Sequence, residues 1–251
     1  MISLKDKVAL ITGGSRGIGQ ATALMFAQAG CDVVVNYRFD EKSAQSVVRE
    51  ALKHGVRAAA IQADVSGKCQ VDAMVEKAVE EFGRIDILVN NAGIWIENPI
   101  DRMTEKNLRD TLDTNLTACF FTIMAVVPHM KRQRSGVIIN ISSTAGQRGE
   151  PFHSPYAATK SALIGLTKSL AVELVDYNIR VNCVAPGWVE TDMSRPSLVG
   201  DEEKKVLSTI PMGRVAHPEE LAGPILFMAS DLASFITGEV LNVNGGAVLC
   251  G

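Results

Sequence analysis

The chain has 251 residues, of which 47% are hydrophobic and 21% are charged. This length and apolar content allow one large α/β domain or two small ones with a substantial core, and they exclude an intrinsically disordered chain. The net charge of −3 gives no electrostatic argument for a nucleic-acid partner.

The sequence also contains no signal for a membrane or a metal. The first residues, MISLKDKVALITGG, have no apolar signal core, and no apolar run approaches the roughly 20 residues that a membrane span needs. The four histidines form no HExxH pattern, and the cysteines, odd in number, form no CxxC pair. We therefore expect a cytoplasmic protein without a metal site, whose thiols are reduced. The cysteines are Cys31, Cys69, Cys119, Cys183 and Cys250.

Strands and helices are predicted to alternate along the whole chain. Seven apolar runs without strict alternation predict strands buried on both faces, at residues 8–12, 33–37, 58–62, 87–90, 137–141, 180–184 and 240–243. Amphipathic stretches predict helices at residues 18–29, 41–54, 70–82, 104–130, 156–175 and 218–229. No linker or composition break divides the chain, so we expect a single doubly wound α/β domain of the Rossmann type over residues 1–251, with a seven-stranded parallel sheet.

A glycine-rich turn joins the first predicted strand to the first predicted helix. It reads TGGSRGIG over residues 12–19, with the spacing GxxxGxG. Glycines allow a tight turn and close approach of a pyrophosphate, and the helix N-terminus supplies free N–H groups. An ordinary βα turn is the alternative. The residues expected to bind a dinucleotide here are Gly13, Ser15, Arg16, Gly17, Ile18 and Gly19.

The end of the second strand indicates which nicotinamide cofactor is used. Sites for NAD place an acid there to bind the ribose 2′-hydroxyl, but this chain has Tyr37 followed by Arg38. Arg38 and Arg16 together suit a 2′-phosphate, so NADP(H) is expected. If Arg38 points to solvent and Asp40 or Glu41 lies near the ribose, NAD(H) remains possible.

The third and fourth strands end in residues that suit the rest of the dinucleotide. Asp64 and Val65 end the third strand, where the acid could bind the adenine amino group. The fourth strand ends in Asn91, Ala92 and Gly93, small or turn-forming residues that let the backbone approach the cofactor.

Tyr156 and Lys160 lie four residues apart, on one face of a predicted helix. An ammonium beside a phenol favours the phenolate and lowers the tyrosine pKa, which suits proton transfer at a substrate oxygen. A chance YxxxK on a solvated helix is the alternative reading of the pair alone.

The longest stretch without a strand follows the sixth strand, over residues 187–237. Its polar front part, residues 190–214, is expected to form a substrate lid, because ligands bind at the carboxyl ends of parallel strands. A solvated helical hairpin is the alternative.

Taken together, the motifs resemble the short-chain dehydrogenase/reductase family over essentially the whole chain. The matching pieces are TGGSRGIG (12–19), Asp64, NNAG (90–93), Asn115, Ser143, YxxxK (156–160) and PGWVETDM (186–193). Within the family the chain is most similar to bacterial 3-oxoacyl-[acyl-carrier-protein] reductases and to glucose-type dehydrogenases.

The resemblance implies a role for each catalytic position. Tyr156 would be the general acid, and Lys160 would lower its pKa and bind the nicotinamide ribose. Ser143 would hold the substrate carbonyl oxygen; Ser142 competes for this role, but the thirteen-residue interval to Tyr156 matches the family at Ser143. Asn115 would anchor a water molecule that relays protons to Lys160. Contacts to the cofactor are also implied for Pro186, Gly187, Val189 and Thr191.

Four residues near these positions could line a substrate pocket. His153 is expected to be a solvated loop histidine, and ordinary packing is the default for the aromatic residues. These are Trp95, Phe152 and Trp188.

The expected function is NADPH-dependent reduction of a 3-oxoacyl thioester or a similar ketone. The alternatives are an alcohol or sugar dehydrogenase and a nicotinamide-binding sensor without catalysis. An acyl carrier protein is a possible partner, since Arg134 matches a docking arginine of the family, although the second docking position is Tyr177.

A homotetramer is expected from the apolar helices and from the chain end, residues 238–251, which is predicted to be a sheet edge and a glycine-rich tail. The candidate interface residues are Phe120, Phe121, Met124, Leu163, Leu166 and Leu170.

Overall fold

The computed structural model describes residues 2–249, so Cys250 and the last residue of the predicted tail lie outside the described residues. Seven parallel strands form one sheet in the order β3-β2-β1-β4-β5-β6-β7. Their bounds are β1 (Val8–Ile11), β2 (Asp32–Tyr37), β3 (Ala58–Gln62), β4 (Ile87–Asn90), β5 (Gly136–Ile141), β6 (Ile179–Pro186) and β7 (Val240–Val243). The predicted doubly wound fold and all seven predicted strands are confirmed.

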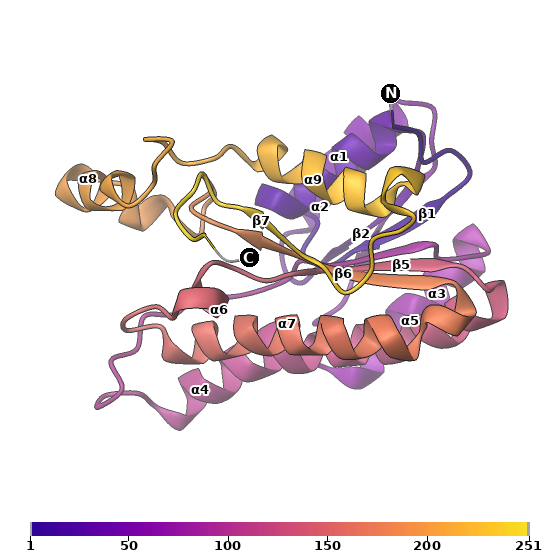
Figure 1. Ribbon diagram of the computed structural model, residues 1–251. Helices are drawn as coiled ribbons and strands as arrows, with labels where there is room; N and C mark the ends of the chain where they lie inside the picture. The colour runs from indigo at the N-terminus through magenta and orange to yellow at the C-terminus, as the bar shows by residue number, and fades with distance from the viewer. Residues whose placement is uncertain (1, 250–251) are drawn as a thin grey trace.

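Helices cover both faces of the sheet (Figure 1). One face carries α1 (Gly17–Gln28), α2 (Glu41–Leu52) and α9 (Pro218–Ala229), and the other carries α3 (Lys68–Phe82), α5 (Ala118–Gln133) and α7 (Ser154–Glu173). The central strands β1 and β4 are buried along their whole length. Their continuous apolar sequence follows from this double cover, since each face of the strand meets a helix layer.

The helix boundaries follow from local capping chemistry. Asp40 accepts a hydrogen bond from the Ser43 N–H at the start of α2, and Thr104 accepts one from Asn107 at the start of α4 (Glu105–Leu112). At the other end of a helix, Gly83 adopts a left-handed φ of 83° and ends α3.

The predicted helix over residues 104–130 is not a uniform α-helix. A π-helical segment, η1 (Asp113–Thr117), separates α4 from α5. Such insertions widen one turn and often mark functional positions, but sequence periodicity does not show them. The combined helix Glu105–Gln133 is long and apolar enough, by length and composition, to span a membrane. Here α5 packs beside α3 and β5, with Val126 and Met130 fully buried.

The segment after β6 contains elements that the sequence did not define. The 3₁₀ turn η3 (Arg195–Ser197) leads to α8 (Gly200–Ser208), which projects from the body of the domain (Figure 1). The base of this segment is fixed by a bridge between Val189 and Ala216. The remaining short elements are α6 (Ala145–Arg148), η2 (Val175–Tyr177) and η4 (Asp231–Ala233).

The surface of α5 and α7 bears directly on the expected assembly. Phe120 and Met124 are 44% and 56% exposed, whereas Leu163 is 1% exposed and packs inside the chain. The expectation that Leu163 meets a second subunit is therefore wrong, because the helix turns that position towards the sheet.

Candidate active site

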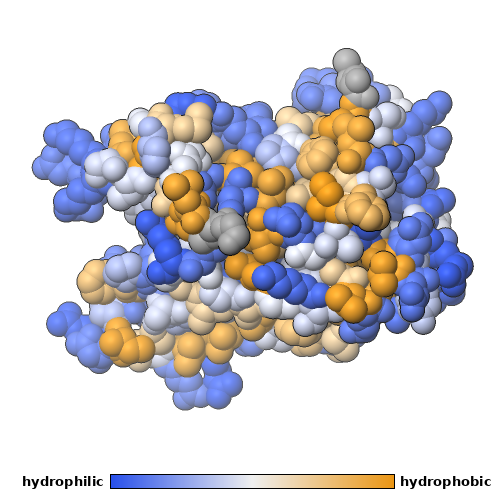
Figure 2. Space-filling view, viewed as in Figure 1, coloured by the Kyte–Doolittle hydropathy of each residue, from blue (hydrophilic) through white to orange (hydrophobic). Residues whose placement is uncertain are grey.

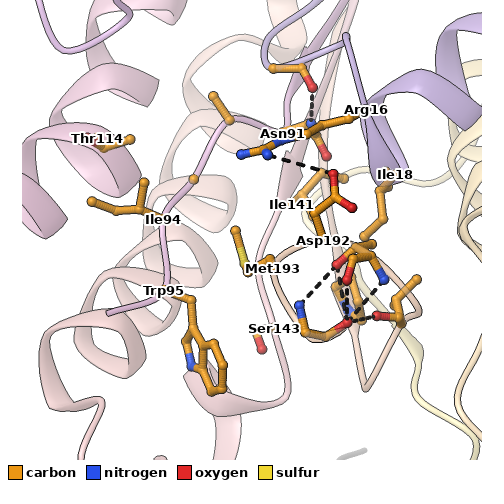
Figure 3. Close-up of a pocket in the computed structure, with 18 of the residues that line it drawn as sticks. Arg16, Ile18, Asn91, Ile94, Trp95, Thr114, Ile141, Ser143, Asp192 and Met193 are labelled. Carbon is orange, nitrogen blue, oxygen red and sulfur yellow. Dashed lines mark hydrogen bonds and ion pairs between the residues drawn. The ribbon is translucent and has the colours of Figure 1, made fainter. Parts of the chain in front are cut away.

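A cleft opens at the carboxyl ends of the strands, where the strand order reverses between β1 and β4. In the space-filling view a notch enters the molecule between α8 and the region where α6 and α7 begin (Figure 2). Ile94, Trp95 and Thr114 lie on one side of the pocket, and Ile18 and Asp192 lie on the other (Figure 3). The first side belongs to the loop after β4 and the helix beyond it.

Nearly all the residues predicted from sequence line this one cleft. The lining includes Ser143, Tyr156 and Lys160 together with every predicted cofactor contact except Gly19. Asn115 and Gly19 do not line the cleft. Asn115 hydrogen-bonds the main chain of the lining residue Ile94, and Gly19 packs closely against the main chain of the lining residue Gly13.

The glycine turn fits a dinucleotide phosphate. Gly13 and Gly17 have φ values of 60° and 54°, which favour glycine. A Cβ on Gly19 would lie 2.4 Å from the Gly13 carbonyl oxygen, so this position also requires glycine. Arg16 precedes α1 without a side-chain cap, and the first turn of α1 contains no acidic residue. The helix therefore presents its N-terminal N–H groups and partial positive charge to the cleft.

Side-chain amides hold this turn against the sheet. The Asn36 side chain accepts a hydrogen bond from the Gly13 N–H at 3.2 Å and donates to the Ala63 carbonyl at 3.0 Å. From the other side, Asn91 Nδ2 donates to the Thr12 and Gly13 carbonyl oxygens at 2.9 and 3.1 Å. Asn36 was not among the site residues predicted from the sequence. Its location at the end of a buried strand is the signal that could have shown this role.

Two arginines, Arg16 and Arg38, lie at the end of the cleft that was predicted to hold the adenosine. Arg38 forms an ion pair with Asp64 at 2.8 Å, and its guanidinium lies 4.6 Å from the centre of the Phe39 ring. Arg16 lies 3.7 Å from Asp192 in a weaker, exposed pair. The end of β2 carries no acidic residue that would bind a ribose 2′-hydroxyl. The two arginines predicted to select a 2′-phosphate, Arg16 and Arg38, both line the cleft. Asp64 orients Arg38 here, in addition to its expected position near the adenine.

Tyr156 and Lys160 project from the first turns of α7 towards the end of β5. The Lys160 side chain is buried; its Nζ donates a hydrogen bond to the Ile141 carbonyl at 2.7 Å and lies 5.6 Å from the centre of the Tyr156 ring. Ser143 follows β5 and lies close enough to the tyrosine for its hydroxyl to lower the pKa of Tyr156. The three side chains that the sequence singled out are therefore neighbours in space.

The pKa of Tyr156 differs from the sequence-based expectation. Burial raises the pKa of Tyr156 to about 12, the hydrogen bond with Ser143 lowers it, and the Glu150 carboxylate raises it further. Burial also lowers the pKa of Lys160. The ammonium donates its hydrogen bond to the Ile141 carbonyl, and its nitrogen lies 5.6 Å from the centre of the tyrosine ring. The protein therefore holds Tyr156 as a protonated phenol, the form that an acid catalyst needs.

The two adjacent serines have different surroundings. Ser142 is buried and donates a hydrogen bond to the Lys160 carbonyl oxygen at 2.7 Å, so it ties β5 to α7. Ser143 Oγ accepts from the Ala145 N–H at 3.1 Å and faces the cleft beside Tyr156. This arrangement favours Ser143 for contact with a substrate oxygen.

Asn115 lies in the π-helical segment and is fully buried. Its Oδ1 accepts a hydrogen bond from the Ile94 N–H at 2.8 Å, and its Nδ2 donates to the Ile94 carbonyl at 2.9 Å. A Cβ on Gly93 would lie 3.3 Å from Asn115 Oδ1 and 3.6 Å from Lys160 Nζ. The Asn115 side chain therefore fixes the loop that passes over the lysine.

A chain of buried polar side chains runs behind the site. Thr122 donates to Asn90 at 2.6 Å, Asn90 to Asn140 at 2.9 Å, and Asn140 to Thr167 at 2.9 Å. These residues belong in turn to α5, β4, β5 and α7. The chain joins β4 and β5, which both end at the cleft, to α5 and to α7, the helix that carries Tyr156 and Lys160.

Aromatic rings form the wall on the substrate side. Trp95 stacks on His153 with ring centroids 4.2 Å apart, and it meets Trp188 edge to face at 5.9 Å. Trp95 Nε1 donates a hydrogen bond to Glu150 at 3.2 Å. The expectation of a solvated His153 is wrong, because the ring is buried beneath Trp95. Phe152, in contrast, is exposed and does not line the cleft.

The segment after β6 lines the remaining side of the cleft, from Pro186 to Ser194. A Cβ on Gly187 would lie 2.9 Å from Asn244 Cα, so the backbone needs glycine there. Ser194 Oγ donates to the Val189 carbonyl at 2.5 Å and accepts from the Thr191 N–H at 3.1 Å, which shapes the turn next to the cleft. Across residues 2–249, no three His, Cys, Asp or Glu side chains are grouped closely enough to hold a metal ion.

Comparison with known proteins agrees with this geometry. A family model described as Enoyl-(Acyl carrier protein) reductase matches residues 13–248. The 3-oxoacyl-[acyl-carrier-protein] reductase FabG of Staphylococcus aureus (strain Mu50 / ATCC 700699) is 45% identical over 240 residues, covering 96% of this chain and 97% of that protein. The 3-oxoacyl-[acyl-carrier-protein] reductase of Synechocystis sp. (strain ATCC 27184 / PCC 6803 / Kazusa) is 44% identical over 250 residues, covering 99% and 100%. The crystal structure of gox2181 has a TM-score of 0.94 at 34% identity and covers 98% of this chain and 96% of that one.

Proposed function

The chain belongs to the short-chain dehydrogenase/reductase family, and from this premise we propose that it reduces 3-oxoacyl thioesters to the corresponding alcohols with NADPH. The observation that carries the proposal is the meeting of Ser143, Tyr156 and Lys160 beside the glycine turn in one cleft. Relatives of nearly equal length that are 43–45% identical and named 3-oxoacyl-[acyl-carrier-protein] reductase support the substrate class.

The cleft offers a place for each part of the cofactor. The N-terminus of α1 would hold the pyrophosphate, and Arg16 and Arg38 would hold the 2′-phosphate. Lys160 would bind the nicotinamide ribose, and the segment Pro186–Thr191 would meet the nicotinamide. When bound, the cofactor supplies the hydride for the reduction.

The side chains of the protein supply the proton and orient the carbonyl group. The Ser143 hydroxyl hydrogen-bonds the substrate oxygen, and the Tyr156 hydroxyl donates its proton to that oxygen as the alcohol forms. Lys160 adds a buried positive charge near the ring as the phenolate develops.

We also propose that the thioester is delivered on an acyl carrier protein. The basic run Lys131–Arg134 lies before β5. The cleft lies after β5, on the order of 20 Å away along this six-residue strand. Arg134 donates to the Asp176 carbonyl at 2.8 Å, and Lys131 lies 4.4 Å from the centre of the Tyr177 ring. A carrier docked on this run would therefore lie about 20 Å from the cleft of the same subunit.

The assembly that we propose is a homotetramer in the cytoplasm. The apolar outer surface of α5, with Phe120 and Met124, supports one subunit interface, and the edge strand β7 supports another. The free thiols of Cys31, Cys119 and Cys183 are buried, and none forms a disulfide, which suits a reducing compartment.

Replacing the proposed proton donor tests the function. Tyr156→Phe removes the transferable proton and keeps the ring, so we expect NADPH-dependent reduction of an acetoacetyl thioester to fall by at least about 10²-fold. Binding of NADPH, measured by calorimetry, should change little, because the phenol contributes little to the cofactor site. A variant that keeps more than about a tenth of the rate would overturn the assignment of Tyr156.

A further inference from the structure

The substrate side of the cleft has an unusual composition. The chain contains only two tryptophans, and both line this wall. Their rings are nearly perpendicular, at 88°, and one face of Trp95 is covered by His153. Figure 3 shows Trp95 on the side of Ile94 and Thr114, across the pocket from Ile18.

A carboxylate completes this wall. Glu150 lines the same pocket and receives the indole N–H of Trp95 at 3.2 Å. Within residues 2–249, no cation approaches it within ion-pair distance. Arg148 also lines the pocket but forms no ion pair with Glu150, and the Lys160 ammonium donates to the Ile141 carbonyl. The negative charge of Glu150 therefore remains available to whatever enters the substrate side.

We propose that Glu150, fixed by Trp95, is a specificity-determining residue that makes the pocket accept neutral or cationic carbonyl substrates and exclude anionic ones. The proposal rests on the proposed function, since it names the charge class of substrate for that same cleft. A thioester is neutral at the bond next to the reacting ketone, whereas the corresponding free 3-oxo acid carries a carboxylate at that place.

The charge of Glu150 and the electrostatics of the indole ring both disfavour an anionic substrate. A substrate carboxylate would be repelled by Glu150, and an indole face attracts cations and not anions. In a partly desolvated pocket such a repulsion of about 1 kcal/mol corresponds to about fivefold in affinity. A neutral ester is not repelled by Glu150 and loses no affinity in this way.

The same charge acts on the proton donor. Glu150 raises the pKa of Tyr156, although burial is the larger cause. The other charged or titratable groups of the pocket wall are Arg16, Tyr37, Arg38, Asp40, Asp64, Arg148, Lys160 and Asp192. His153 lies behind Trp95. Of these groups, Glu150 is the one that raises the tyrosine pKa by its charge.

Glu150→Gln is the matched change, because glutamine keeps an oxygen for the Trp95 N–H and removes only the charge. Glu97→Gln is the control. It makes the same change at an exposed residue of the loop after β4, and Glu97 does not line the cleft. Since both tryptophans line the pocket, quenching of intrinsic fluorescence reports binding without turnover.

The experiment compares methyl acetoacetate with acetoacetate, which differ in charge at one end. We expect the native protein and Glu97→Gln to prefer the ester, and this preference in Kd to fall about fivefold in Glu150→Gln. An unchanged ratio of the two Kd values in Glu150→Gln would overturn the proposal, and so would a loss of the same size in Glu97→Gln.

A pH profile gives a second readout that a merely structural role would not move. In the oxidative direction Tyr156 must be deprotonated, so the rate rises with pH through its pKa. Removing the Glu150 charge stabilises the phenolate, and the rise should begin at least about half a pH unit lower in Glu150→Gln, with methyl 3-hydroxybutyrate as substrate. A profile that coincides with the native one would count against Glu150.

These readouts separate the two proposals. If simple ketones are reduced and acetoacetyl thioesters are not, the proposed function fails, but the fluorescence ratio still decides the role of Glu150. If the thioester is reduced and the ratio does not respond to Glu150→Gln, the proposed function stands and the inference about Glu150 fails.

Discussion

At the end of the cleft proposed for the adenosine, the expected preference for NADPH depends chiefly on Arg38. It follows β2 directly, lies against Phe39 and is oriented by Asp64 at 2.8 Å. A guanidinium in this position matches a 2′-phosphate in charge and geometry, and a carboxylate would match the 2′-hydroxyl of NADH.

Arg38→Asp should therefore reverse the cofactor preference. We expect KM for NADPH to rise at least about tenfold, as for the loss of one charged hydrogen bond, while the efficiency with NADH rises relative to it. Steady-state kinetics with both cofactors measure the change, and Arg102→Asp, an exposed position outside the cleft, is the control. If the ratio of efficiencies stays the same, another residue makes the selection.

The residue scale also shows what a spacing in the sequence leaves undetermined. The YxxxK interval was sufficient to predict that Tyr156 and Lys160 share a helix face. It was not sufficient to predict the pKa of Tyr156, because desolvation depends on the packing of other segments around the ring. The Glu150 carboxylate lies in the same pocket through a loop whose path no local pattern shows.

At the scale of the elements, the position of α5 and α7 against the sheet depends on the buried chain Thr122–Asn90–Asn140–Thr167. Each member is satisfied by the next, so removing one leaves its neighbours with unpaired buried groups. Asn140 is the central member and is fully buried between β4 and α7.

Asn140→Ala should destabilise the fold by about 2–3 kcal/mol, read from the urea midpoint at an unchanged slope. Asn90→Ala should have a similar effect, and the double variant should lose at least about 1 kcal/mol less than the two single losses together. Strictly additive losses would show that the two amides do not form one unit.

An element can be predicted from the sequence when its own residues form a local pattern, and not when contacts with distant segments define it. The seven strands were predicted within two residues at every boundary, because double burial produces apolar runs that stand out. The π-helical turn at Asn115 and the short α6 were not predicted, since each is fixed by contacts with distant segments, such as those of Asn115 with Ile94. Residues 190–214 were correctly predicted to contain no strand, but α8 was only an alternative there, because its polar sequence is equally typical of a solvated loop. Whether this segment closes over a substrate stays a prediction.

At the scale of the whole molecule, the proposed tetramer depends on apolar side chains that the single chain leaves exposed. Phe120→Asp combined with Met124→Asp places two charges on the outer surface of α5 without disturbing buried positions. We expect light scattering to give a mass well below four times the 26.9 kDa of the chain. Leu52→Glu, on α2 at the opposite face of the sheet, should leave the mass unchanged. A full-size assembly of the double variant would exclude α5 as an interface.

The most direct test of the account is the steady-state reduction of an acetoacetyl thioester by the unmodified protein with NADPH and with NADH. Arg16 and Arg38 in the cleft wall, with Ser143 and Tyr156 at its other end, predict saturable turnover in which NADPH is favoured at least about tenfold in kcat/KM. No turnover of the thioester with either cofactor, or equal efficiency with both, would contradict it.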